Sequence, residues 1–244
     1  MGKIRTAYTL LAASFGPQGW WPTTPHNSVQ PTYSGGPKNE RQMFEVIVGS
    51  ILTQNTSWKN AEKAIINLHR HNLLDLEKLD AVPEKKLALL IKSSGYYNQK
   101  AKKITHALLF LREYPLRELK KLPLSELRRV LLGVPGIGKE TADSIALYAF
   151  KRPIFVVDAY TRRIFSRIGI ITGEEEYDEI RKKVEREFSP MPDREKAKAF
   201  NEYHALIVQQ GKDICKKEPA CQRCPLSKGC RYTKQNIYKA LNPV

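Results

Sequence analysis

The sequence has few acidic residues for its size, few cysteines and no long apolar run. Its 25 Asp and Glu residues are outnumbered by 41 Lys and Arg residues, which gives a formal net charge of +16. No segment approaches the roughly 20 apolar residues that a membrane-spanning helix needs, so we expect no membrane partner. The apolar run from Thr9 to Phe15 is short and interrupted by polar residues, which argues against a signal peptide. The basic excess favours a polyanionic partner, with nucleic acid as the first candidate.

All four cysteines lie within 16 positions near the end of the chain. They are Cys215, Cys221, Cys224 and Cys230, separated by five, two and five residues. Thiols this close together favour a metal site over disulfides, and they suggest a reducing compartment, the cytoplasm or nucleoid. The set suits a [4Fe–4S] cluster, with a zinc ion held by four thiolates as the alternative. Nearby basic residues could face phosphates, or they could form a solvated surface that offsets the negative charge of the cluster.

The periodicity is helical over most of the chain, and no internal repeat is apparent. Asn55 or Thr56 is expected to cap a helix that contains Trp58, and Pro83 is expected at the start of another helix. Alternation typical of strands is absent except for a weak signal at 154–157. The sequence therefore predicts an all-α protein.

A Pro-Gly-x-Gly turn at 135–138 joins two apolar helical patterns and predicts a helix-hairpin-helix. Its glycines, Gly136 and Gly138, permit positive φ and a close approach of backbone to a ligand. The N–H groups at the start of the second helix, near Lys139 and Thr141, could hold a phosphate. Such a hairpin grips DNA without reading its bases. A plain turn between two core helices is the alternative.

A lone acid, Asp158, follows the hairpin in the stretch 156–160. By itself it is expected to cap a helix, and it could be catalytic as well. Upstream, Trp20 and Trp21 are adjacent in a Pro- and Gly-rich segment, where they either fill the core or stack on bases. Phe44 lies on an apolar helical face and has a core role as its simplest interpretation.

Taken together, these motifs resemble the endonuclease III superfamily of DNA glycosylases, over roughly residues 38–232. The resemblance rests on 52–56, 95–101, the hairpin, Val157-Asp158, 204–211 and the cysteine tail. It implies that Asp158 is catalytic and that Gln54 is the wedge that fills the space of an extruded nucleotide. Helix capping is the alternative role of Gln54. The first cysteine gap has five residues, where the endonuclease III pattern has six.

One departure from this family concerns the reaction. Members that also cleave the strand carry a lysine directly before the Thr-Ala of the hairpin helix, where this chain has Glu140. Lys139 is one residue earlier, and one residue turns a helical side chain by about 100°. We therefore expect a monofunctional glycosylase that uses water, with Asp158 stabilising the oxocarbenium-like sugar or activating the water.

The expected base is an alkylated purine. Trp20, Trp21 and Pro22, together with Phe44 and Glu140, resemble the pocket of the bacterial 3-methyladenine DNA glycosylases of this superfamily. A purine alkylated on a ring nitrogen is cationic, so aromatic faces attract it. Some members of that subgroup lack the cluster that the cysteines predict here.

The resulting expectation is a two-lobed helix-hairpin-helix glycosylase fold with a C-terminal [4Fe–4S] loop. One lobe is a helical barrel at 38–150, and the other combines 1–37 with 151–244. The protein is expected to act as a monomer on double-stranded DNA that contains a damaged base. Alternatives are a mismatch (T/G or U/G) or oxidised-base glycosylase of the same superfamily and a non-catalytic iron–sulfur DNA-binding protein.

Overall fold

The computed structural model describes residues 2–234, and within that range the backbone forms helices and no strand. The all-α prediction is confirmed. The segment 154–157 has no regular secondary structure. An isolated bridge joins Thr23 to Thr32. None of the helices in the described range is long and apolar enough to cross a membrane.

The chain divides into two compact units. Unit 1 contains the residues up to Gln18 and those from Pro153 onward, and unit 2 runs from Gly19 to Arg152. The sequence placed 19–37 with the C-terminal lobe, whereas this segment groups with the middle of the chain. It does so because Trp21 packs against Gly49 and Tyr148.

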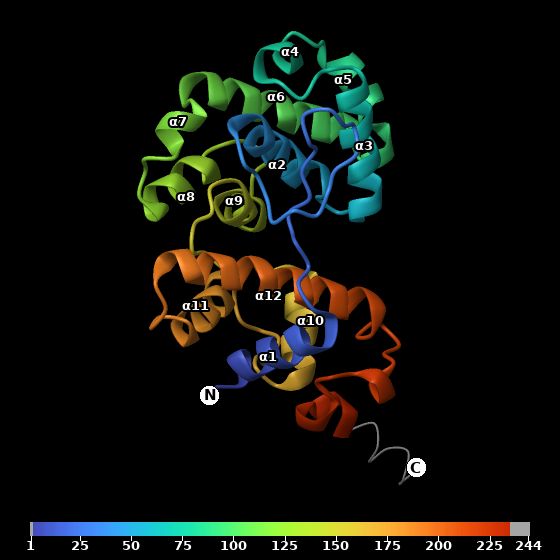
Figure 1. Ribbon diagram of the computed structural model, residues 1–244, viewed down its shortest axis with the longest axis vertical. Helices are drawn as coiled ribbons and strands as arrows, with labels where there is room; N and C mark the ends of the chain where they lie inside the picture. Colours follow the sequence, from blue (N-terminus) through green and yellow to red (C-terminus); the bar gives the residue numbers. More distant parts are fainter. Residues whose placement is uncertain (1, 235–244) are drawn as a thin grey trace. The chain divides into compact units, whose positions relative to one another are not determined.

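Unit 2 is built around the central helix α2 (Glu40–Leu52; Figure 1). Its elements are α2 (Glu40–Leu52), α3 (Trp58–Arg70), α4 (Leu76–Asp80), α5 (Glu84–Leu90), η1 (Lys92–Ser94), α6 (Tyr97–Glu113), α7 (Leu116–Leu119), α8 (Leu124–Leu132), α9 (Lys139–Ser144) and the π-helical turn η2 (Ile145–Ala149). Every residue of α2 from Gln42 to Leu52 is buried, as expected of a helix surrounded by other helices. It packs against α3, α6, α9 and η2.

Two helix starts in unit 2 test the expected boundaries. Pro83 is the N-cap of α5, at the start of the helix as predicted, and the N–H that proline lacks is not needed there because the first N–H groups of a helix have no partner within it. The N-cap of α3 is Ser57, so the prediction of Asn55 or Thr56 was wrong. Asn55 has a φ of 51° and belongs to the preceding turn, which delays the start of the helix.

Unit 1 has an aromatic core. It contains α1 (Lys3–Phe15), α10 (Ala159–Ile168), α11 (Tyr177–Glu187), α12 (Asp193–Asp213) and the 3₁₀ turns η3 (Cys221–Arg223) and η4 (Ser227–Gly229). α12 packs against both α1 and α10. Tyr203 of α12 lies in this core against Phe155, Phe165 and Phe188, and its hydroxyl donates to the carbonyl of Ile4 at 3.1 Å. This contact fixes α1 on α12.

Candidate functional site

The predicted hairpin is present as α8, a turn and α9. Val134 and Ile137 are buried and anchor the turn to the core. Gly136 has a φ of 92°, and a Cβ built on it would overlap the side chain of Lys103. The position therefore requires glycine twice over, for its backbone conformation and for space.

Gly138 is different. It is the N-cap of α9 in an extended conformation, and a Cβ built there would meet nothing within 4 Å. Within the described chain no neighbour demands a glycine at this position. The open space leaves room for another molecule to come close to this stretch of backbone.

A partly buried ion pair ties the two hairpin helices together. Nε of Arg128, on α8, donates to Oδ1 of Asp143, on α9, at 2.7 Å, and a second guanidinium nitrogen reaches Oδ2 at 3.3 Å. The Asp143 side chain has no exposed surface. Because the contact is two-pronged, it fixes the relative orientation of the helices as well as their distance.

The first turn of α9 carries three of the predicted residues. Lys139 and Glu140 are exposed there, and Thr141 is buried. Thr141 accepts a hydrogen bond from Nε2 of Gln54 at 3.0 Å. The hairpin is thus joined to the turn between α2 and α3, a connection that the sequence did not indicate.

Lys100 and Lys103 of α6 both reach this region. The Lys100 ammonium is buried and donates to the carbonyls of Leu52, at 2.8 Å, and Ser94, at 2.6 Å. Burial, with a contribution from the charge of Lys103, lowers the pKa of Lys100 from 10.5 to about 8. Its position between two carbonyls makes it a structural cation rather than a free nucleophile.

The predicted base-pocket aromatics form part of a larger cluster. Trp20 and Trp21 both lie against Trp58 of α3, with ring centroids 5.1 and 5.4 Å apart, and Trp21 also touches Tyr148. Trp21 is only 4% exposed, whereas Trp20 is half-buried. Pro22 and Phe44 are buried too. Trp20 is therefore the less buried member of the tryptophan pair.

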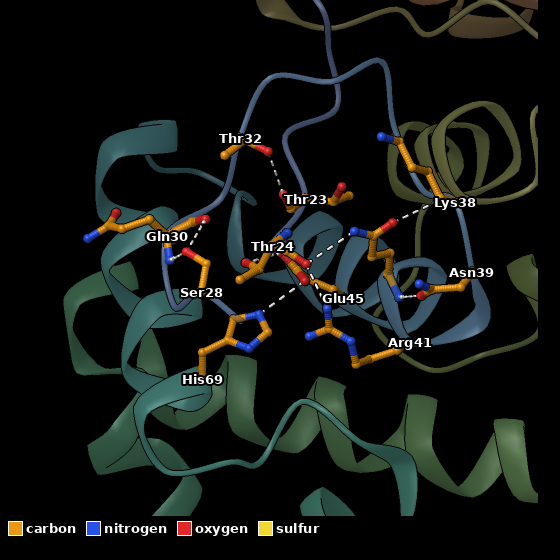
Figure 2. A network of polar contacts seen from close by, with 11 residues as sticks. Thr23, Thr24, Ser28, Gln30, Thr32, Lys38, Asn39, Arg41, Glu45 and His69 are labelled. Carbon is orange, nitrogen blue, oxygen red and sulfur yellow. Dashed lines mark hydrogen bonds and ion pairs between the residues drawn. The ribbon is translucent and has the colours of Figure 1, made fainter. Parts of the chain in front are cut away.

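The loop that carries these tryptophans is fastened to α2 through a buried carboxylate. Figure 2 shows Glu45 between Thr24 and His69. Glu45 accepts from the N–H and the hydroxyl of Thr24 at 3.0 and 2.8 Å and contacts Nε2 of His69 at 3.0 Å. The carbonyl of Thr24 accepts in turn from Arg41 at 2.7 Å. These contacts position the segment directly after Trp21.

Asp158, in unit 1, caps α10 as predicted. Its Oδ1 accepts from the N–H and the hydroxyl of Thr161 at 2.7 and 2.9 Å. Its Oδ2 lies 3.6 Å from Nε2 of His204, and the two side chains are 12% and 11% exposed. Burial by itself raises the pKa of Asp158, but His204 and the two Thr161 donors outweigh it, so the pKa lies below its ordinary value.

His204 is the residue of this site that the sequence analysis missed as a partner. It lies on α12, 46 positions after Asp158, and only the packing of α10 on α12 brings the two together. A histidine on an amphipathic helix carries no signal for such a role. The hairpin residues and the aromatic cluster belong to unit 2.

The four cysteines line one cavity in unit 1, together with Arg167 and Gln210. Arg167 donates to Sγ of Cys215 at 3.2 Å, and Gln210 donates to Sγ of Cys224 at 3.1 Å. Burial, and to a lesser extent the neighbouring Cys215 and Cys230, raise the pKa of the Cys224 thiol. Within residues 2–234, no three His, Cys, Asp or Glu side chains are grouped so as to share one metal ion.

Comparisons with known proteins identify the class to which this fold and site belong. Residues 48–190 match the HhH-GPD superfamily of base excision DNA repair proteins. The chain is 41% identical, over 93% of its length and 95% of the relative's, to a chain of Methanocaldococcus jannaschii provisionally named a DNA repair glycosylase. It is 30% identical to the endonuclease III of Thermotoga maritima over 80% of its own length and 87% of that enzyme's.

Solved structures agree with this class. Endonuclease III in a non-covalent DNA complex has the same fold, with a TM-score of 0.73, 22% identity and coverage of 97% of this chain and 98% of that one. The H. pylori 3-methyladenine DNA glycosylase bound to 1,N6-ethenoadenine has a TM-score of 0.66 and 26% identity, with coverage of 87% and 98%. The chain belongs to the HhH-GPD superfamily and is an endonuclease III-like DNA glycosylase of base excision repair.

Proposed function

We propose that this glycosylase is monofunctional and hydrolyses the N-glycosidic bond of an alkylated purine of the 3-methyladenine type. The observation that carries the proposal is the environment of Asp158, which keeps a little-exposed carboxylate ionised. A second support is Glu140, which occupies the position of the strand-cleaving lysine in the endonuclease III pattern. Attack by water is then the remaining route.

The proposal assigns the sugar to Asp158. As the base departs, the sugar acquires oxocarbenium character, and a nearby carboxylate stabilises that positive charge. Thr161 hydrogen-bonds one carboxylate oxygen and His204 lies 3.6 Å from the other, so little reorganisation is needed at the moment of reaction. The same carboxylate orients the incoming water or accepts its proton.

The proposal assigns the base to the aromatic cluster of unit 2. An alkylated purine is cationic, so the ring of the half-buried Trp20 would attract it more strongly than it would attract a neutral base. Such a base is already a good leaving group, so weak acid assistance suffices. Glu140 would add negative charge at the base edge. The 26% identity to the H. pylori 3-methyladenine enzyme is consistent with this assignment.

Double-stranded DNA is the proposed partner of the monomer. The turn at Gly136 and Gly138, with Lys139, would face the phosphate backbone, and the net charge of +16 would draw DNA toward the protein. Gln54 is assigned to the space that the extruded nucleotide leaves.

The thiol lining of the cysteine cavity supports a [4Fe–4S] cluster as the proposed cofactor. The donors in this cavity are Cys215, Cys221, Cys224 and Cys230, and its described lining contains no carboxylate or imidazole. Soft thiolates of this kind select iron–sulfur clusters or zinc. The N–H groups of Arg167 and Gln210 already point at two of the sulfurs, as donors that stabilise ligated thiolates. A cluster bound there would cross-link the loop 215–230.

Metal analysis of anaerobically purified protein tests the cofactor. The proposal expects iron and acid-labile sulfide in equal amounts, with both reduced in a Cys221→Ser variant. If the protein instead contains one zinc per chain and no sulfide, the cofactor is the zinc ion rather than the cluster.

Chromatography of the bases released from dimethyl-sulfate-treated DNA tests the reaction. We expect free 3-methyladenine and a strand that stays intact until alkali is added. Asp158→Asn keeps an oxygen for Thr161 and should still bind DNA, while base release falls by about 10²–10⁴-fold. Release of thymine or uracil from mismatched duplexes, without 3-methyladenine release, would move the assignment to the mismatch class.

A further inference from the structure

The Gln54 side chain is fully hydrogen-bonded within unit 2. Its Nε2 donates to the carbonyl of Gly136 at 3.1 Å and to the hydroxyl of Thr141 at 3.0 Å. Its Oε1 accepts from the ammonium of Lys103 at 2.5 Å. Both N–H groups and the oxygen of the carboxamide are therefore engaged. A side chain held in this way cannot at the same time fill a vacancy in a DNA base stack.

Lys103 is the residue that closes this arrangement. Its methylenes lie where a Cβ of Gly136 would be, so the side chain runs along the hairpin turn. One helical turn further along α6, Nδ1 of His106 lies 3.1 Å from the carbonyl of Pro135. α6 thus contacts the turn through two residues, and its Lys103 ammonium sits beside the backbone that is proposed to face phosphate.

The bond between Lys103 and Gln54 is one that a phosphate can replace. Lys100, one turn earlier, donates to two carbonyls and is buried. Lys103 is only half-buried, and its ammonium donates to the neutral amide oxygen of Gln54. An ammonium is attracted more strongly by the full negative charge of a phosphate than by the partial charge of an amide oxygen. A DNA phosphate at the hairpin would therefore compete well for this ammonium.

We propose that Lys103 is a positioning residue that stores Gln54 against the hairpin until DNA arrives. When the hairpin meets a phosphate, the Lys103 ammonium pairs with it and gives up Oε1 of Gln54. The carboxamide is then free to leave Gly136 and Thr141 and to enter the duplex. This inference rests on the proposed function, in which Gln54 fills the space of the extruded nucleotide, and it adds the event that releases Gln54. It links opening of the base stack to engagement of the backbone.

Lys103→Met tests the proposal, since methionine keeps the chain that covers Gly136 and removes the charge. Lys102→Met is the matched control, because Lys102 is the neighbouring, exposed lysine of the same helix. The readout is the side-chain amide signal of Gln54 in protein labelled with ¹⁵N-glutamine, assigned with Gln54→Ala. We expect slow solvent exchange of these protons in wild type and in Lys102→Met, and exchange about tenfold faster in Lys103→Met, because the charge-assisted bond is gone.

Addition of an undamaged duplex supplies the second comparison. The Gln54 signal of the wild type should move toward that of free Lys103→Met as the hairpin engages. A duplex with 2-aminopurine should fluoresce more strongly per bound complex with Lys103→Met than with wild type. The double variant Lys103→Met/Gln54→Ala should remove this increase.

Two results would overturn the proposal: equal exchange in Lys103→Met and Lys102→Met, or a Gln54 signal that DNA leaves unmoved. Neither readout depends on base release. If no DNA yields a free base while the Gln54 signal responds, the proposed function fails and the role of Lys103 stands. If bases are released while the signal stays fixed, the role of Lys103 fails and the proposed function stands.

Discussion

Nε2 of His204 lies 3.6 Å from Oδ2 of Asp158, while the other carboxylate oxygen accepts from Thr161. Each oxygen of the carboxylate therefore has its own neighbour, one from the same helix and one from α12. The pair keeps the pKa of Asp158 below its ordinary value in spite of burial. The carboxylate is thus ionised over the whole neutral range.

The first prediction concerns the acid side of the rate profile. His204→Asn removes an interaction that lowers the pKa of Asp158, while the burial that raises it remains. The pKa of Asp158 should rise, so base release should lose a larger fraction of its rate at about pH 5 than at about pH 7. Single-turnover rates across this range measure the effect.

His71→Asn is the control for this experiment, because His71 is exposed and belongs to unit 2, whereas Asp158 and His204 belong to unit 1. Its rate profile should match that of wild type. An unchanged acid limb in His204→Asn would show that the histidine has no part in holding Asp158 ionised.

The second prediction concerns Glu140. Wild type should give no covalent complex with DNA when borohydride is present, because no amine stands at this position. Glu140→Lys should introduce an amine able to form a Schiff base, and reduction should trap it. A denaturing gel of protein and labelled DNA measures the band. Trapping by wild type would contradict the monofunctional assignment.

The third prediction separates the two hairpin glycines. Gly136→Ala should destabilise the fold by about 1–2 kcal/mol through its positive φ, with further cost from the overlap with Lys103. Gly138→Ala should change the free energy of unfolding by less than about 0.5 kcal/mol, because its backbone is extended and the space is open. Urea unfolding measures both variants.

DNA binding by the same pair completes that test. If backbone at Gly138 approaches a phosphate, Gly138→Ala should weaken duplex binding although its stability is normal. Normal binding by this variant would remove Gly138 from the proposed DNA contacts.

The fourth prediction uses the lowered pKa of Lys100. Between about 8 and its ordinary 10.5, the unfolded chain binds more protons at this residue than the folded chain does, so rising pH stabilises the fold there. The difference in unfolding free energy between wild type and Lys100→Met should move in favour of wild type over this interval and stay flat below it. Urea titrations at several pH values measure these free energies. If the interpretation is wrong, the unfolding free energies of wild type and Lys100→Met will run parallel over the whole pH range.

Local features of the chain predicted much of the fold. Periodicity gave the helices, Pro83 marked a helix start, and Pro135 to Gly138 marked the hairpin. These features depend on backbone preferences of a few neighbouring residues. The cap of α3 was missed because asparagine is favoured both at N-caps and in left-handed turns, and Asn55 takes the turn conformation here.

The site was predictable only in part. Asp158 could be predicted from the sequence, because a carboxylate directly before a helical pattern is a local signal for an N-cap. The roles of three other residues depend on packing between distant parts of the chain. His204 lies 46 positions from Asp158, Lys103 lies 49 positions from Gln54, and Trp58 lies 38 positions from Trp20. No local preference encodes such pairings, so they could not be inferred from the sequence.

By itself, the sequence determined the class of structure, the basic charge, the hairpin and the cysteine group, since each depends on composition or on spacing within a short stretch. Only the tertiary structure decided that 19–37 joins unit 2, that Gln54 is bonded to the hairpin and that His204 faces Asp158. The physical reason is that these contacts form between helix faces, and a face acquires its neighbours only when the buried surfaces of the whole unit pack together.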